Sequence, residues 1–124
     1  MQTHRELLVE PIGLEVETLP RPIDWPALFG NDHPVEMEIG MGKGTFLTEQ
    51  SKARPETNFF GIEWARWFWK YASDRLRRNG CLNARAVRAE AGGIAGLKRL
   101  VADLSLDKDM LKSVIAKNGL SSQL

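Results

Sequence analysis

The chain has 124 residues, of which 43% are hydrophobic and 27% are charged, and its formal net charge is +1. This length fits one domain at most. The sequence contains no apolar run long enough to cross a membrane, and its first residues lack the apolar stretch of a secretory signal. The single cysteine, Cys81, can form neither an internal disulfide nor a zinc site alone, so we expect a reducing, cytoplasmic environment.

The charges are unevenly distributed along the chain. Residues 1–63 carry five Lys/Arg and eleven Asp/Glu, whereas residues 64–88 carry seven Lys/Arg and one Asp. Basic side chains gathered on one element can bind a nucleic-acid backbone, although a solvated helix face has the same composition. The basic residues of this block are Arg66, Lys70, Arg75, Arg77, Arg78, Arg85 and Arg88.

Residues 1–34 are expected to form an irregular lead-in. Five of the six prolines fall in this segment, and proline at such spacing prevents long helices. Three apolar residues near its end, Trp25, Leu28 and Phe29, are placed to dock the segment onto a core.

Three strands and two helices are expected to alternate after the lead-in. The strands are predicted at 35–39, 58–63 and 83–89, and the helices at 45–54 and 64–79. This order indicates the βαβαβ half of an open parallel sheet, that is, an α/β fold of Rossmann-like type. In the second helix, the apolar spacing predicts one buried face, with Trp69 exposed. That face comprises Trp64, Trp67, Phe68, Tyr71, Ala72 and Leu76.

The character of the sequence changes after Ala91. Gly92 and Gly93 form a break, and residues 97–118 then read as one or two helices. Their apolar residues are spaced by three and four with one defect, which is at the threshold of a coiled coil. Residues 92–124 are therefore predicted to be a helical tail that self-associates through 97–118. The alternative is a helix that packs on the third strand.

The segment Glu38-Ile-Gly-Met-Gly-Lys-Gly44 carries the clearest chemical signal. Glycines after a strand and before a helix let the backbone approach a nucleotide-like ligand closely. The spacing matches neither the phosphate loop of nucleotide hydrolases nor the dinucleotide-binding fingerprint. A simple tight turn is the plainer interpretation.

Three acidic residues lie at or next to the carboxyl ends of the three predicted strands: Glu38, Glu63 and Glu90. Because the carboxyl ends of parallel strands line the binding crevice, we expect these side chains to gather at one edge. An acid at the position of Glu63 can accept hydrogen bonds from two ribose hydroxyls, although a carboxylate near a helix start is also favourable in itself. An acidic crevice disfavours phosphates and suits a cationic adenosine compound, of which S-adenosyl-L-methionine is the best fit.

Residues 33–91 resemble the N-terminal half of the tRNA (guanine-N7)-methyltransferase family. The resemblance rests on Val35 to Leu47, Asn58 to Glu63 and Asn83 to Ala91. It implies S-adenosyl-L-methionine as the methyl donor and tRNA as the substrate. The donor-binding residues that it implies are Glu38, Gly40, Gly42, Glu63 and Glu90, the last in place of the family's usual Asp. Arg66, Lys70, Arg77 and Arg78 are the candidate tRNA contacts.

The family also has a further strand that ends in a Pro-Asp-Pro-Trp-type segment, followed by acids that hold the guanine. Neither feature occurs in this sequence. We therefore expect residues 35–91 to form a truncated methyltransferase domain that contains the donor half, with weak or no catalysis by this chain.

Residues 97–118 resemble the leucine-zipper end of the small subunit of a bacterial insertion-sequence transposase. This second resemblance implies that the tail 92–124 is foreign to the domain. It leaves open a non-enzymatic alternative, in which the tail assembles copies of the chain and the basic helix binds nucleic acid. A third possibility is a chain that does not fold stably, because strand 35–39 would have an unpaired edge.

Overall fold

The computed structural model describes residues 5–90, 94–104, 110–116 and 120–122. No helix in these ranges is long and apolar enough to span a membrane. In chain order the elements are β1 (Gly13–Glu15), a 3-10 turn (Val16–Thr18), α1 (Trp25–Phe29), β2 (Val35–Ile39), α2 (Thr45–Ala53), β3 (Asn58–Glu63), α3 (Arg66–Arg78), β4 (Ala84–Arg88), α4 (Ile94–Leu104), β5 (Leu111–Ala116) and β6 (Leu120–Ser122).

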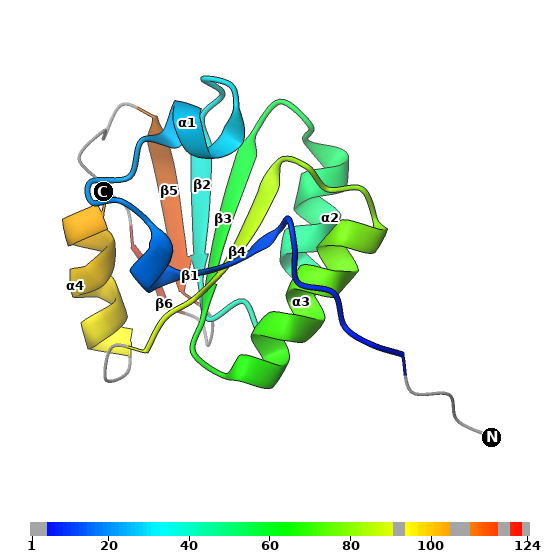
Figure 1. The fold of residues 1–124 in the computed structure, drawn as a ribbon. Helices are drawn as coiled ribbons and strands as arrows, with labels where there is room; N and C mark the ends of the chain where they lie inside the picture. Colours follow the sequence, from blue (N-terminus) through cyan, green and yellow to red (C-terminus); the bar gives the residue numbers. More distant parts are fainter. Residues whose placement is uncertain (1–4, 91–93, 105–109, 117–119, 123–124) are drawn as a thin grey trace.

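The strands form one sheet in the order β1-β4-β3-β2-β5-β6, parallel except for the antiparallel pair β5-β6. Helices α2 and α3 lie on one side of the sheet and α4 lies on the other (Figure 1). The predicted succession of β2, α2, β3, α3 and β4 is confirmed, and so is the Rossmann-like α/β fold. The chain runs outward from β2 to β4 and then returns to β5 on the other side of β2. The point where the strand order reverses, between β2 and β5, is where such sheets bind ligands.

Alternation along the strands divides the apolar residues into two cores. Met37, Phe60 and Val87 pack with Trp25 and Phe29 of α1 on one face of the sheet. Phe59, Ala84 and Ala86 pack with residues of α2 and α3 on the other face. Both faces of the central strands are therefore buried, as expected for a parallel sheet with helices on both sides.

The prediction for the aromatic residues of the second helix is wrong. Trp69 is buried and its Nε1 donates to the backbone oxygen of Ala86 at 2.9 Å, whereas Trp64, Trp67 and Phe68 are exposed. Helix α3 instead buries a face with small residues. A Cβ added at Gly44 would lie 2.9 Å from the Cβ of Ala72, so α3 approaches the start of α2 too closely for large rings.

Two further predictions require correction. The lead-in is not irregular throughout, because it contributes β1, which pairs with β4, and α1, whose N-cap Asp24 accepts from Ala27 N at 3.1 Å. The tail is not helical over 97–118. Helix α4 ends at Leu104, and Leu111–Ala116 forms β5, which pairs in parallel with β2. Residues 92–93, 105–109, 117–119 and 123–124 of the predicted tail lie outside the described residues.

The pairing of β5 with β2 also changes the prediction of an open edge. The backbone of β2 is paired on both sides, with β3 and with β5. Strand β2 is therefore protected in the interior of the sheet rather than exposed as an aggregation-prone edge.

Replacing Gly44 with Ala should destabilise the fold more than the same change at Gly30. Both glycines have positive φ, +77° and +76°, but only at Gly44 does an added Cβ meet other atoms within 4 Å. Gly30→Ala should cost about 1–2 kcal/mol of unfolding free energy from backbone strain. Gly44→Ala should add an overpacking cost of about 1–3 kcal/mol. Urea unfolding measures both, and equal losses would contradict the close packing of α2 on α3.

Candidate functional site at the carboxyl edge of the sheet

The glycine turn between β2 and α2 is held against the end of β3. Gly40 N and Met41 N both donate to the backbone oxygen of Ile62, at 2.7 and 3.1 Å. Gly42 has a φ of +58°, and the place where its Cβ would be is open space. This conformation favours glycine and leaves the turn backbone accessible to a ligand.

Glu63, the last residue of β3, joins this turn to the start of α3. Its buried carboxylate accepts from Gly42 N through Oε1 at 2.8 Å and from Ala65 N through Oε2 at 2.9 Å. A carboxylate has about four acceptor positions. These two backbone bonds therefore leave Glu63 able to accept further hydrogen bonds from a ligand.

Glu38 lies near the end of β2 and is buried. It is the register partner of Gly61, which is two residues before Glu63 on β3. Because side chains alternate along a strand, Glu38 and Glu63 point to the same face of the sheet, the face that α2 and α3 cover. The structure thus brings these two predicted acids together at one edge and on one face.

Glu90 lies at the same edge but in a different environment. It follows β4 by two residues, is exposed, and its Oε1 accepts from Arg88 Nη2 at 2.7 Å. Arg88 is itself the register partner of Glu63. The third predicted acid therefore stands at the solvent side of the edge and is engaged by a cation.

The candidate tRNA contacts differ in how freely they face solvent. Arg66 is exposed and forms an ion pair with Glu15 at 3.2 Å, and Lys70 is half-buried. Arg77 and Arg78 both bind the carboxylate of Asp74, each at 2.8 Å. Three of the four predicted residues therefore make ion pairs within the chain, and their contact with tRNA stays a prediction.

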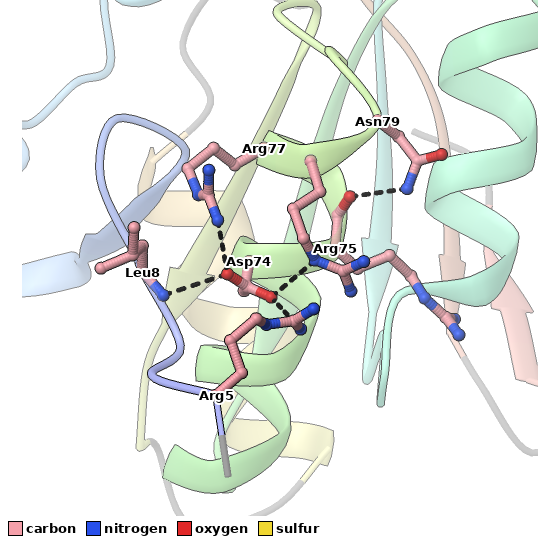
Figure 2. A network of polar contacts seen from close by, with 7 residues as sticks. Arg5, Leu8, Asp74, Arg75, Arg77 and Asn79 are labelled. Atoms are coloured by element: carbon pink, nitrogen blue, oxygen red, sulfur yellow. Dashed lines mark hydrogen bonds and ion pairs between the residues drawn. The ribbon is translucent and has the colours of Figure 1, made fainter. Parts of the chain in front are cut away.

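Asp74 is a buried, ion-paired carboxylate that the sequence analysis did not identify. Its fully buried carboxylate also binds Arg5 at 2.7 Å and accepts from Leu8 N at 3.1 Å (Figure 2). Burial alone would raise the pKa of this carboxyl. The bonds from Arg77, Leu8 N and Arg78 and the charge of Arg5 outweigh burial and lower the pKa to about 2. In the sequence, these ion pairs are indicated by the spacing alone, since Asp74 lies three and four residues before Arg77 and Arg78.

The network around Asp74 should stabilise the fold above pH 4 and lose this effect in strong acid. Because the folded pKa lies below the ordinary value of 3.8, the stabilisation is full above that value and disappears as the pH falls through about 2. The shift corresponds to about 2 kcal/mol. Urea unfolding of the wild-type chain and Asp74→Asn should therefore differ most near neutral pH and converge near pH 2. A difference that does not change with pH would contradict this assignment.

Comparison with known proteins places the site in a family. Residues 32–112 match a family described as "Putative methyltransferase". The match includes the glycine turn and all three acids, and it continues through α4 to the start of β5. The matched family and the relatives below concern methyltransferases, so the resemblance of 97–118 to a transposase stays a prediction.

Curated relatives named tRNA (guanine-N(7)-)-methyltransferase match the same region. The protein from Rhodopirellula baltica is 45% identical over 75 residues, 60% of this chain and 28% of the relative. The protein from Myxococcus xanthus is 38% identical over 85 residues, 68% of this chain and 41% of the relative. The protein from Geobacillus sp. strain WCH70 is 46% identical over 67 residues, 54% of this chain and 30% of the relative.

The matches thus span between 28% and 41% of the length of these relatives. The family match covers residues 32–112, which is well over half of the chain. This chain belongs to that putative methyltransferase family.

Proposed function

We propose that the carboxyl edge of β2, β3 and β4 binds S-adenosyl-L-methionine, and that the chain supplies the donor-binding part of a cytoplasmic enzyme that methylates guanine N7 in tRNA. The observation that carries the proposal is the buried carboxylate of Glu63, bonded to Gly42 N and Ala65 N. The printed names of the relatives supply the choice of tRNA guanine as substrate.

The donor site follows from the chemistry of these groups. Glu63 keeps acceptor capacity for the two ribose hydroxyls of an adenosine. Glu38 adds a second buried carboxylate on the same face, which attracts the positive charges of the donor. Gly40 and Gly42 keep the turn free of side chains, and Glu90 completes the acidic edge on its solvent side.

The same edge discriminates against phosphorylated ligands. A dinucleotide that bonded its ribose to Glu63 would place its pyrophosphate at the glycine turn, and the carboxylate of Glu38 just before that turn would repel it. S-adenosyl-L-methionine has an adenosine, an ammonium and a sulfonium, and no phosphate. Its charges therefore complement this edge, whereas those of a dinucleotide do not.

The acceptor chemistry requires positioning rather than acid–base catalysis. Guanine N7 has an exposed lone pair, which attacks the methyl carbon while the electrons of the carbon–sulfur bond return to sulfur. Such a transfer depends on holding the two reactants in line. Lys70 and Arg66, whose ion pair with Glu15 lies at the surface, are the proposed phosphate contacts. The family's guanine-holding segment is not present in this sequence.

The alternative is a non-enzymatic assembly or nucleic-acid-binding fragment derived from a transposase fusion. It depends on self-association through 97–118. The pairing of β5 with β2 weakens this proposal, because Leu111–Ala116 cannot belong to the sheet and to a zipper at once. Helix α4 is the described part that is left to carry such an interface.

Calorimetric titration with S-adenosyl-L-methionine tests the proposal directly. The chain should bind the donor, and Glu63→Gln should weaken binding at least about 10-fold, since a hydrogen bond to a charged group contributes about 1.5–3 kcal/mol. Glu38→Gln should also weaken binding. The control is Glu36→Gln, on the same strand two residues before Glu38, where the carboxylate is bonded to Arg54. No binding by the wild-type chain, or equal effects of all three variants, would refute the donor site.

A further inference from the structure

The surface beside the proposed donor site carries three exposed aromatic side chains. They are Trp64, Trp67 and Phe68, and they are 41%, 54% and 40% exposed. We name these three residues the aromatic platform. Large apolar side chains that gather on a surface mark an interaction site, because burying them removes unfavourable contact with water.

Cations border the platform. Lys43 Nζ lies 5.7 Å from the ring centroid of Trp67 and 5.6 Å from that of Tyr71. Trp67 stacks on Tyr71 with centroids 5.3 Å apart and an angle of 26° between the rings. Arg75 Cζ lies 5.2 Å from the Tyr71 centroid. Two cations therefore lie against the rings of Trp67 and Tyr71.

The platform is continuous with the carboxyl edge of the sheet. Trp64 directly follows Glu63, and Lys43 stands in the turn between Gly42 and Gly44. A guanine that reaches the methyl group of a donor bound at this edge brings its neighbouring nucleotides to the surface around the edge. The platform is part of that surface.

We propose that the aromatic platform stacks an unpaired base of the RNA substrate while Lys43 contacts the adjoining phosphate. The proposal rests on the proposed function and adds residues beyond the basic side chains of α3. Aromatic faces bind every base, and a positive charge beside them matches the phosphate of the same nucleotide. Residues 64–88 carry a net positive charge, which attracts the negatively charged RNA. An apolar protein surface with few acidic residues would gain nothing from this charge.

Binding of a short fluorescent single-stranded RNA to the full chain tests this proposal by anisotropy. Trp67→Ala and Phe68→Ala should each weaken binding roughly 5- to 100-fold, the range typical of one lost base stack. Trp67→Phe should retain most of the affinity. Leu82→Ala is the matched control, because Leu82 is 71% exposed but lies between α3 and β4. Its RNA affinity should not change.

Two further measurements separate stacking from charge. An RNA of equal length with abasic sugars should bind the wild-type chain and Trp67→Ala equally well. Lys43→Gln should weaken binding to both RNAs and reduce the salt dependence by about one counterion. Equal RNA affinities of Trp67→Ala and Leu82→Ala would overturn the proposal.

Two other outcomes would also overturn it. One is sedimentation that shows a dimer of the wild-type chain lost in Trp67→Ala, with RNA binding unchanged, since a second copy would then cover the platform. The other is a chain that binds S-adenosyl-L-methionine but not RNA. This result would refute the proposal for the platform and leave the proposed donor site supported. Loss of donor binding with RNA binding retained would refute the proposed function alone.

Discussion

The carboxylate of Glu63 connects the parts of the molecule on which the proposed function depends. It is buried at the end of β3 and accepts from the glycine turn through Gly42 N and from the start of α3 through Ala65 N. A buried carboxylate without partners would cost several kcal/mol, so these two bonds are a requirement of the fold as well as a feature of the site. Any ligand that bonds to Glu63 therefore acts on the turn, the strand and the helix together.

The arrangement of α3 explains why polar chemistry and exposed aromatic rings are found at the same edge. Its small residues face α2 and β1, where Ala72 lies against Gly44 and Ser73 against Gly13. Because that face packs so closely, Trp67 and Phe68 lie on the outside of the helix.

The same helix holds Asp74, whose bond to Arg5 attaches the N-terminal segment to α3. One helix thus contacts the proposed donor edge, carries two residues of the platform and holds residues 5–8 of the chain.

The parts of the fold with strong local patterns were predictable from the sequence. The bounds of β2 and β3 agree with the prediction, because alternating or apolar runs end there at glycine or at a helix start. Strand β1 was not predictable, because its three residues become a strand only by pairing with β4. Strand β5 was mistaken for helix, since a short apolar run such as Leu111–Ala116 fits both periods.

The candidate site was predictable in position but not in detail. Chain order alone places Glu38, Glu63 and Glu90 at one edge of a parallel sheet. The contact between Glu63 and Gly42 depends on the positive φ of the turn, and the engagement of Glu90 by Arg88 depends on a side chain of the neighbouring strand. The burial of Asp74 depends on the path of residues 5–8, which no periodicity reports.

The most direct measurement of the central claim is a proton–nitrogen NMR spectrum of the chain with and without S-adenosyl-L-methionine. If the donor binds at Glu63, the amide signals of Gly42 and Ala65 should shift on titration, since both amides donate to that carboxylate. The amide signals of Gly30 and Gly80, at the other end of the strands, should not shift. Shifts confined to Gly30 and Gly80, or no shifts at all, would contradict a donor site at the carboxyl edge.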